Sequence, residues 1–453
     1  MLKRLIKFLS PNGTPRAARR APHVIPSGSH PLTPDHISSG ARNVVDVLKG
    51  QGYQAYVVGG CVRDALLGLH PKDFDVATDA TPEQVTALFR RSRIIGRRFR
   101  IVHVHMGREV IEVTTFRAGH GDGNHKDAVQ SDQGMLLRDN VFGNIDEDAR
   151  RRDFTANALY YDPQANTLYD YANGVRDIES RTLVVIGDPE TRYREDPVRM
   201  LRAARFAAKL GFSISPESAA PIVPLSGLIA DVPPARLFDE VLKLFLSGHA
   251  LATFRQLQDY QLSAQLFPQT AEILARDSSG FYLDFIEQAL TNTDKRIRTN
   301  QRVTPAFLFA ALLWPAVNHM RAEFEARGET PAMAIQKAGG LVVARQVNRI
   351  AIPRRFSQPM REIWDLQQRL PNRTGTRAGH LVSLPRFRAA YDFVLLREQA
   401  GEDLNGLGHW WTRYQDADES GRRKLVEALG REPAAKRKRR RRAPRKPRPP
   451  TES

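Results

Sequence analysis

"VVGGCVRDALLGLHPKDFDVAT", residues 57–78, begins as an apolar strand, turns at a glycine pair and continues as a short helix. It ends in "DFDVAT", residues 73–78, which has the alternation of a second strand. Gly59 and Gly60 allow the backbone to approach a phosphate closely, and the amides that open the following helix would face that phosphate. Arg63 adds a positive charge nearby. The stretch therefore predicts a phosphate-binding turn next to a strand.

Two aspartates open the second strand. Because successive side chains of a strand alternate between its faces, Asp73 and Asp75 would point to the same face. Phe74 and Val76 would point into the core. Carboxylates held together repel one another and raise each other's pKa unless cations lie between them. The pair therefore favours a cation site, while two aspartates that merely face water remain the alternative.

The cation that suits this pattern is Mg²⁺, which prefers carboxylate oxygens together with substrate phosphates. Two Mg²⁺ ions about 4 Å apart can activate an attacking oxygen and stabilise a leaving one. Glu112, in "VIEVTTF" on a neighbouring predicted strand, is the candidate for a third acid. We therefore predict Asp73 and Asp75 as metal ligands, with Glu112 as a further catalytic carboxylate.

The composition describes a globular chain. With 453 residues, 41% hydrophobic and 26% charged, it should form two to four domains with a large core. Its one cysteine, Cys61, excludes an intramolecular disulfide and fits a reducing cytosol. No apolar run approaches the roughly 20 residues that cross a bilayer, and "MLKRLIKFLSP" is too short for a secretory signal. We expect a cytoplasmic protein, with contact of "LKRLIKFL" with the inner membrane surface left open.

The net charge of +18 is concentrated at the two ends. Residues 1–34 hold six Lys or Arg and no acid, and residues 434–450 hold ten and no acid, which leaves +2 for the rest. Such segments cannot bury enough apolar surface to fold, so we predict a basic disordered arm over 1–34 and a disordered arginine-rich tail over 421–453. This charge density favours binding to nucleic acid over a solvated tail.

The hydrophobic pattern divides the middle of the chain. Helices and strands alternate up to about residue 185, with a long polar loop expected over 117–137. From about residue 186 the periodicity is helical almost to the tail and includes "PAFLFAALLW", a stretch suited to a buried helix. The pattern predicts a head of helices and strands followed by an all-α body.

Two further motifs carry charged residues. "EDARRRDFTANALYYD" places an aspartate among arginines, and "RYREDPVRMLRAARFAAKLGF" opens a helix. Asp196 before Pro197 is expected to be the N-cap of this helix, with proline at the first helical position. Three arginines then recur at every third residue along one side of the helix, namely Arg199, Arg202 and Arg205.

Together these motifs resemble the class II nucleotidyltransferases, the family of bacterial poly(A) polymerases and tRNA CCA-adding enzymes. The resemblance covers about residues 45–250 and extends more weakly to near residue 415. "IIGRRFRIVHV" and the arginine-rich tail resemble the poly(A) polymerase branch. The catalytic motifs show no departure from the family pattern, since Cys61 is a small residue where many relatives carry Gly or Ala.

The resemblance implies an α+β fold. It predicts a nucleotidyltransferase head with a small mixed β-sheet over 35–185, followed by all-α neck, body and leg domains. The neck, over 186–250, would recognise the base and bind RNA, and the helical body, over 251–420, would bind RNA.

The implied activity is template-independent addition of AMP from ATP to RNA 3′ ends, in RNA processing and decay. Two Mg²⁺ ions are the implied cofactor, ATP is the substrate, and RNA-decay proteins are further partners. A tRNA CCA-adding enzyme is the alternative, and a catalytically silent RNA-binding protein is a remote one.

The resemblance also implies roles for individual residues. Asp73 and Asp75 would bind the metals, and the triphosphate would lie near Gly59, Gly60 and Arg63. The residues implied near the ribose and phosphates are Arg152, Asp153 and Asn157, with Asp153 counted among the catalytic carboxylates. A structural alternative pairs Asp153 with a neighbouring arginine. The residues implied as a protein template for the base edge and phosphates are Asp196, Arg199, Arg202 and Arg205.

Two other features are interpreted as structural. His103 and His105 share a strand face, but no Cys or His cluster joins them, so packing or hydrogen bonding is favoured over a metal site. Trp410 and Trp411 could stack on bases, but aromatic residues in a helical body are more often core.

Overall fold

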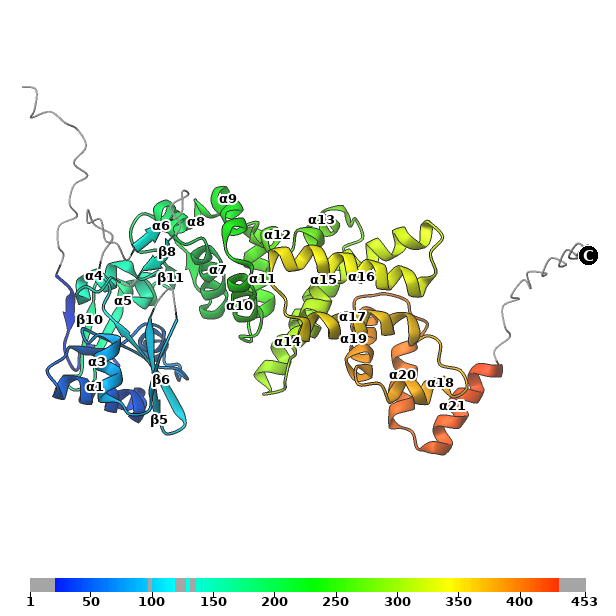
Figure 1. Ribbon diagram of the computed structural model, residues 1–453, viewed down its shortest axis with the longest axis horizontal. Helices are drawn as coiled ribbons and strands as arrows, with labels where there is room; N and C mark the ends of the chain where they lie inside the picture. The colour runs from blue at the N-terminus through cyan, green and yellow to red at the C-terminus, as the bar shows by residue number, and fades with distance from the viewer. Residues whose placement is uncertain (1–20, 97–99, 119–127, 131–135, 140, 432–453) are drawn as a thin grey trace, which may run out of the picture. The chain divides into compact units, whose positions relative to one another are not determined.

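The computed structural model describes residues 21–96, 100–118, 128–130, 136–139 and 141–431 (Figure 1). The chain forms two compact units. The first unit comprises Met1–Pro268, Thr293–Gln301 and Asn348–Ala351. The second unit comprises Gln269–Asn292, Arg302–Val347 and Ile352–Ser453. Within the described residues, none of the helices is both long and apolar enough to span a membrane.

The first unit contains an eight-stranded sheet in the order β1-β10-β9-β2-β3-β6-β5-β4. Its strands are β1 (His23–Ile25), β2 (Ala55–Val58), β3 (Asp75–Thr78), β4 (Ser92–Ile95), β5 (Ile101–Met106), β6 (Glu109–Thr115), β9 (Leu159–Asp162) and β10 (Thr167–Asp170). Strands β3 and β6 are parallel, and the other neighbouring pairs are antiparallel. The prediction of an α+β fold with a mixed sheet is confirmed.

Two short strand pairs lie outside this sheet. They are β7 (Ala128–Gln130) with β8 (Leu136–Asp139), and β11 (Thr182–Leu183) with β12 (Ser213–Ile214). The first pair falls in the predicted loop over 117–137, so the described part of this segment is not loop throughout.

The helices of the head cover the sheet. They are α1 (Ser39–Gly50), α2 (Gly60–Leu66), α3 (Pro82–Leu88), α4 (Ile145–Arg151) and α5 (Gly174–Glu179), with 3-10 turns η2 (Pro34–His36) and η3 (Thr155–Asn157). Helices α1 and α3 pack on each other and on the strands (Figure 1). Thr81 caps α3 by accepting a hydrogen bond from the Gln84 amide, as its sequence predicts. Below, "head" means the eight-stranded sheet with α1–α5.

The rest of the first unit is helical. Its elements are α6 (Pro189–Glu195), α7 (Val198–Leu210), α8 (Pro216–Ala219), α9 (Ile222–Leu225), η4 (Ser226–Asp231), α10 (Pro234–Phe245), α11 (Ala250–Asp259) and α12 (Leu262–Leu266). Helix α7, called the neck helix below, buries Leu201 and Ala204 and ends at Gly211, which has a left-handed backbone. Helices α10 and α11 pack against it.

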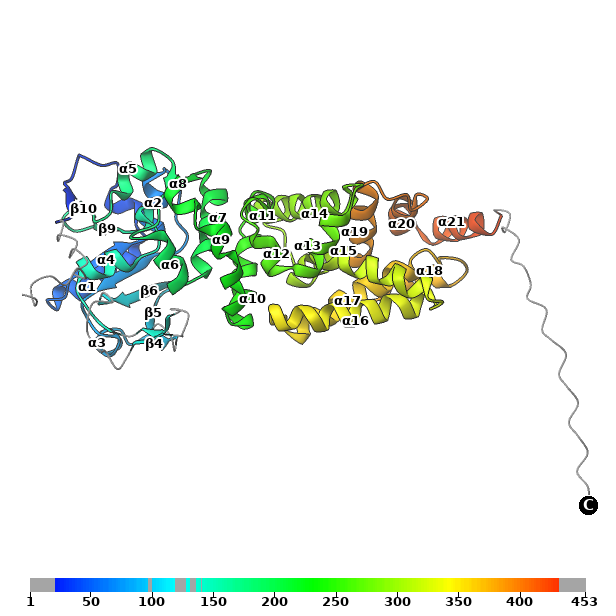
Figure 2. The same ribbon diagram turned by 90° about the horizontal axis from the view of Figure 1, so that it is seen from above.

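The chain then continues as long helices, and the second unit is built from them. They are α13 (Pro268–Arg276), α14 (Phe281–Arg298), α15 (Pro305–Ala326), α16 (Pro331–Arg349), α17 (Arg354–Arg369), α18 (Arg377–Val382), α19 (Phe387–Gln399), α20 (Leu407–Asp416) and α21 (Glu419–Arg431). Helices α16 and α17 lie side by side (Figure 2). Gly339 of α16 leaves room for the Trp364 ring of α17, since a Cβ at this position would lie 3.1 Å from that ring. "PAFLFAALLW" lies in α15 and is buried, as predicted.

The tryptophan pair in α20 belongs to the core of the second unit. Trp411 is fully buried and donates its indole N–H to the Leu370 carbonyl at 3.2 Å. Trp410 is half-buried, stacks on Tyr414 and carries the Arg373 guanidinium over its ring. The interpretation of these aromatic residues as core is confirmed for Trp411.

The structure differs from the predicted boundaries at three places. Residues 23–25 of the predicted arm form β1, which pairs with β10. Residues 421–431 of the predicted tail are helical in α21. Helix α11, assigned by sequence to the body, packs along the neck helix and belongs to the first unit. Local composition misses all three because pairing and packing partners lie elsewhere in the chain. The remaining arm and tail, 1–20 and 432–453, lie outside the described residues.

We predict that Trp364→Ala destabilises the second unit by about 3–5 kcal/mol, because it removes a buried ring and leaves a cavity. The Trp364 side chain is buried and its indole N–H donates to the Ala310 carbonyl at 3.1 Å. All four tryptophans lie in the second unit, so urea unfolding followed by tryptophan fluorescence reports on this unit through the remaining three.

Met333→Ala is the control, since Met333 is 48% exposed on α16 of the same unit. It should change the unfolding free energy by less than about 0.5 kcal/mol. Equal shifts of the urea midpoint in the two variants would show that Trp364 is not a core residue.

Candidate active site

The turn between β2 and α2 brings the backbone close to charged side chains. Gly59 has φ 79°, a left-handed conformation that favours glycine. A Cβ on Gly59 would lie 3.3 Å from Arg152 Nη1 and 3.7 Å from Asp75 Oδ2. Gly60 opens α2 and lies against Arg63. The predicted glycine turn is therefore present and lies next to Asp75, one member of the predicted acid pair.

The strand β3 presents Asp75 at one end of the sheet. Asp75 is aligned with Glu112 on the parallel strand β6, and Asp73 is exposed just before β3 begins. Burial raises the pKa of Asp75 to about 6, with further increases from Glu112 and Asp73 that Arg152 and Arg202 partly offset. The negative charge at Asp75 is therefore incompletely compensated by the protein.

This carboxylate fits a divalent cation. Among the described residues no hydrogen bond reaches the Asp75 oxygens, so their lone pairs are available. Carboxylate oxygens are the ligands that Mg²⁺ prefers, and a cation would relieve the repulsion between Asp75 and its acidic neighbours. Asp73 and Asp75 supply the donor chemistry that Mg²⁺ requires.

Glu112, the predicted third acid, does not join Asp73 and Asp75 in a metal-binding group among the described residues. The described part of the chain holds no group of three or more His, Cys, Asp or Glu side chains placed to hold a metal. Glu112 is instead half-exposed, with its Oε1 3.3 Å from His103 Nε2. Glu112 therefore shapes the charge at Asp75 from the adjacent strand, and His103 pairs with this acid.

Asp153 joins the head to the neck helix. Its Oδ2 accepts hydrogen bonds from Arg202 Nε at 2.7 Å and Nη2 at 2.5 Å. Its Oδ1 accepts from the Asn157 amide at 3.0 Å and the Phe154 backbone at 2.9 Å. Although burial would raise it, these partners, Arg202 foremost, hold the pKa of Asp153 well below its usual range. The sequence left open that Asp153 pairs with an arginine for structural reasons. Its partner is Arg202, which is itself one of the predicted site residues.

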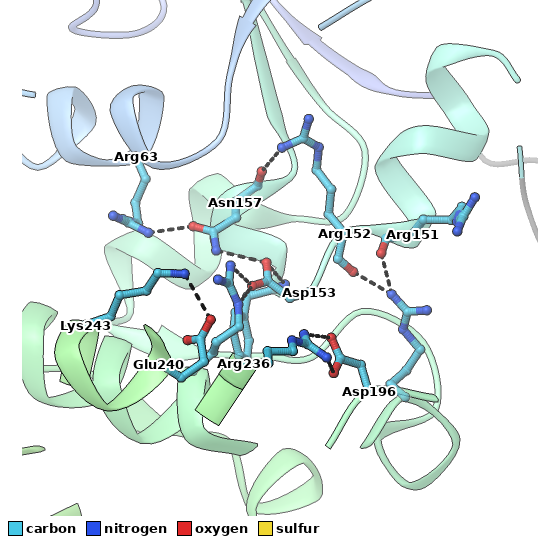
Figure 3. A network of polar contacts seen from close by, with 12 residues as sticks. Arg63, Arg151, Arg152, Asp153, Asn157, Asp196, Arg236, Glu240 and Lys243 are labelled. Atoms are coloured by element: carbon cyan, nitrogen blue, oxygen red, sulfur yellow. Dashed lines mark hydrogen bonds and ion pairs between the residues drawn. The ribbon is translucent and has the colours of Figure 1, made fainter. Parts of the chain in front are cut away.

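Arg63 lies behind the site and not on its surface. It is 2% exposed and donates from Nη1 to Asn157 Oδ1 at 2.5 Å (Figure 3). Its Nε donates to Asp64 Oδ1 at 2.8 Å. All of its guanidinium nitrogens face protein acceptors, so Arg63 orients Asn157, whose amide in turn bonds Asp153.

Arg152 is held beside Asp75 by two other side chains. Its Nε donates to Tyr160 Oη at 2.9 Å and its Nη2 to Asp148 Oδ2 at 3.2 Å. Tyr160 also donates to Asp148 at 2.6 Å. Burial alone would lower the pKa of Arg152, but Tyr160 and Asp148 outweigh burial and raise it. The site therefore keeps a fixed positive charge next to Gly59 and Asp75.

Asp196 does not cap the neck helix as predicted. It binds Arg236 with both carboxylate oxygens, at 2.8 and 2.7 Å (Figure 3), and α7 begins two residues later at Val198. The capping prediction is wrong because Pro197, and not Asp196, is at the N-cap of α7. Arg236 lies 40 residues away, so no local sequence signal could have indicated it.

The three arginines of the neck helix have different surroundings. Arg199 binds Glu195 at 3.0 Å and the Arg192 carbonyl at 2.7 Å. Arg202 binds Asp153, as described above. Arg205 stacks on the Phe206 ring, and its buried Nε has no hydrogen-bond partner among the described residues. Burial and the neighbouring Arg202 lower the pKa of Arg205 to about 10.

Five residues of this site were missed by the sequence analysis. They hold the predicted residues in place and are Asp64, Asp148, Tyr160, Glu195 and Arg236. All of them except Arg236 lie within the recognised motifs.

Cys61 follows the glycine turn, and its buried thiol is unreactive. Its thiol is buried and donates to the Val58 carbonyl at 3.2 Å. Burial, with the charge of Asp75, raises the pKa of Cys61 to about 12. The thiol therefore stays protonated near neutral pH and is not a nucleophile.

Three family models match separate parts of the chain. The poly A polymerase head domain matches residues 55–184, and the probable RNA and SrmB-binding site of polymerase A matches 211–274. The polymerase A arginine-rich C-terminus matches 327–446.

Named relatives cover most of the chain. Poly(A) polymerase I of Salmonella typhi is 46% identical over 94% of this chain and 94% of its own length. The protein of the same name from Haemophilus influenzae is 46% identical over 89% of this chain and 90% of its own. A CCA-adding enzyme of Lactobacillus helveticus is 38% identical over 49% of this chain and 54% of its own.

Solved structures share the fold. The CCA-adding enzyme of Bacillus stearothermophilus in complex with CTP aligns with a TM-score of 0.53 at 24% identity, over 86% of this chain and 82% of that one. The Thermotoga maritima CCA-adding enzyme complexed with tRNA aligns with a TM-score of 0.52 at 17% identity, over 86% and 94%.

Fold, site and head-domain match together define a nucleotidyltransferase of the class that comprises poly(A) polymerases and CCA-adding enzymes. The CCA-adding match covers about half of this chain, whereas the poly(A) polymerase matches span nearly all of it. The chain belongs to the bacterial poly(A) polymerase I family.

We predict that Asp75→Asn stabilises the metal-free protein at pH 8. Because the folded pKa of Asp75, about 6, exceeds its ordinary value of 3.8, folding favours the protonated acid. The contribution of Asp75 to stability therefore falls as pH rises from 4 through 6, by up to about 3 kcal/mol, and the asparagine variant lacks this loss. Calorimetry in a chelating buffer should show a higher Tm for the variant at pH 8 and convergence near pH 4.

Asp73→Asn is the control, because this exposed aspartate should give a smaller gain. Added Mg²⁺ should raise the Tm of the wild type and leave that of Asp75→Asn nearly unchanged. A gain that does not depend on pH would contradict electrostatic strain at Asp75.

Proposed function

We propose that this chain is a template-independent RNA adenylyltransferase, which adds AMP from ATP to the 3′-hydroxyl of RNA. The 3′ oxygen forms a bond to the α-phosphorus, the bond to pyrophosphate breaks, and the hydroxyl proton passes to solvent. The observation that carries this proposal is the 46% identity with poly(A) polymerase I over 94% of both chains. Two features of the site support the proposal. Asp75 at the end of β3 has a carboxylate without a hydrogen-bond donor among the described residues, and Asp153 forms an ion pair with Arg202.

Asp73 and Asp75 are the residues that would hold Mg²⁺. Two bound Mg²⁺ ions would acidify the 3′-hydroxyl and neutralise charge on the departing pyrophosphate. Glu112 would contribute by keeping the charge around Asp75 negative, since its carboxylate raises the pKa of Asp75 from the next strand. No covalent enzyme intermediate is required.

The basic residues of the site divide between binding and support. Arg152 would attract the triphosphate near the turn at Gly59 and Gly60, where its charge is fixed by Tyr160 and Asp148. Asp153 would act through Arg202, because its own pKa is too low for proton transfer near neutral pH. Asn157 would orient Asp153, because it accepts a hydrogen bond from the buried Arg63 and donates one to Asp153.

Base recognition would involve the start and outer side of the neck helix. Asp196 is oriented by Arg236, and Arg199 by Glu195, so their polar atoms have defined directions before a nucleotide binds. Arg202 and Arg205 would complete the set that contacts base and phosphates. A pocket of fixed donors and acceptors can favour adenine over cytosine because the two bases present different edges.

RNA 3′ ends and ATP are the partners that this reaction requires. We infer that residues 434–450, which lie outside the described residues, contact RNA phosphates through their ten Lys and Arg. RNA-decay proteins and a cytoplasmic location, with or without contact with the inner membrane surface, also belong to this proposal. They fit an enzyme that acts on RNA and carries one buried, reduced cysteine.

The choice of nucleotide tests the proposal. Purified protein should add many adenylates to an unstructured RNA from ATP, use CTP poorly, and continue past one nucleotide on a tRNA that ends in CC. Ordered addition of C, C and A to truncated tRNA alone would establish the CCA-adding alternative. RNA binding without transfer of any nucleotide would establish a silent RNA-binding protein.

We predict that Asp73→Ala lowers the rate of AMP addition by more than about a thousandfold in Mg²⁺, because it removes a metal ligand from the transition state. RNA binding, measured by filter retention, should be retained, since the loss is confined to the metal site.

Asp35→Ala is the matched control, because the Asp35 side chain is 91% exposed in the same unit and away from the site. It should retain wild-type rates. Near-normal AMP addition by Asp73→Ala would remove Asp73 from the metal role.

A further inference from the structure

Three guanidinium groups gather around one aromatic ring in the first unit. The Cζ atoms of Arg63, Arg202 and Arg205 lie 5.1, 5.2 and 4.6 Å from the centroid of the Phe206 ring. Phe154 of the head meets the same ring edge to face at 5.7 Å. Each guanidinium is within the range of a cation–π contact, which strengthens when the groups are withdrawn from water.

The same residues belong to a closed circuit of polar contacts. Arg202 of the neck helix binds Asp153, Asp153 binds Asn157, and Asn157 binds Arg63 (Figure 3). Arg63 binds Asp64, and Asp64 returns to the neck helix through Lys209 Nζ at 3.2 Å. Because Arg202 and Lys209 are two helical turns apart, both face the head, and Phe206 lies between them on α7.

The crowding of these cations requires an explanation. Arg63 and Arg202 have carboxylate partners, but the buried Nε of Arg205 has no hydrogen-bond partner among the described residues. A leucine at position 206 would fill most of the apolar space without attracting the cations, whereas the face of a phenylalanine ring carries negative potential. The ring therefore adds to the carboxylates of Asp64, Asp153 and Glu240 in offsetting repulsion among the three arginines.

We propose that Phe206 is a positioning residue of the nucleotide site, whose ring holds the guanidinium groups of Arg202 and Arg205 in place before ATP binds. This rests on the proposed function, since those arginines are taken to contact the nucleotide. Groups held in their bound geometry lose less entropy when the ligand arrives, so Phe206 contributes to ATP affinity without touching ATP.

Two replacements of Phe206 test the proposal. Phe206→Leu keeps an apolar side chain and removes the ring, and pentafluorophenylalanine at position 206 nearly keeps the shape and reverses the charge of the ring face. Both should raise the KM for ATP, and the Kd for ATP in direct binding, by about tenfold or more. The affinity for RNA should stay within about twofold of the wild type.

Phe212→Leu is the matched control. Phe212 follows the same helix and is 6% exposed, compared with 8% for Phe206, and no cation lies over its ring among the described residues. It should leave the KM and Kd for ATP unchanged. A structural role of Phe206 would instead give the two leucine variants the same modest loss.

The outcomes separate this proposal from the proposed function. Wild-type affinity for ATP in the pentafluorophenylalanine protein would overturn the positioning role, even if Phe206→Leu fails to fold. Failure of the wild type to transfer AMP would overturn the proposed function, and direct ATP binding would still decide the role of Phe206. A rise in the Kd for ATP in both Phe206 variants, absent in Phe212→Leu, supports the proposal.

Discussion

The ion pair between Asp153 and Arg202 is the interaction on which the site depends. It joins the motif that follows α4 to the neck helix, 49 residues later in the chain, beside the contact between the Phe154 and Phe206 rings. Both side chains are largely withdrawn from water, and removal of one partner from such a pair leaves the other charge uncompensated. Asn157 and the Phe154 amide complete the shell of Asp153, so the orientation of Arg202 is determined from the head. The neck helix is thereby fixed relative to the glycine turn and β3.

Asp75, at the start of β3, has no such hydrogen-bond donors among the described residues. Asp153 has four donors, whereas Asp75 has none among the described residues and stands beside Glu112 and Asp73. Asp75 and Asp153 both interact with Arg202 but differ in how far protein donors compensate their charge. Asp153 supports a neighbouring arginine, and Asp75 is available to a cation. An uncompensated buried charge lowers stability, which is a recurrent property of sites built for a ligand that arrives later.

Sequence reasoning succeeded where the determinants are local. The glycine turn, the cap at Thr81 and the alternation around Asp75 each depend on a few adjacent residues, and all appear in the structure. It failed where a distant partner competes. Asp196 has the neighbours of an N-cap, yet Arg236 takes its carboxylate, and the burial of Arg63 depends on Asn157 from another segment. Charge type is readable from a sequence, but the partner that satisfies each charge is set by the fold.

The site and the comparisons answer different questions. The acid pair, the glycine turn and the arginines of the neck helix are the groups to which the proposed function assigns nucleotide transfer, and the CCA-adding enzymes share the fold that carries them. Because the CCA-adding enzymes have this fold too, the fold alone does not specify which product is made. The branch is decided by similarity along the whole chain, including the arginine-rich C-terminal match over 327–446, which lies outside the residues that build the site. The assignment to this branch therefore draws on sequence in both units, whereas the contacts that build the site lie inside the first unit.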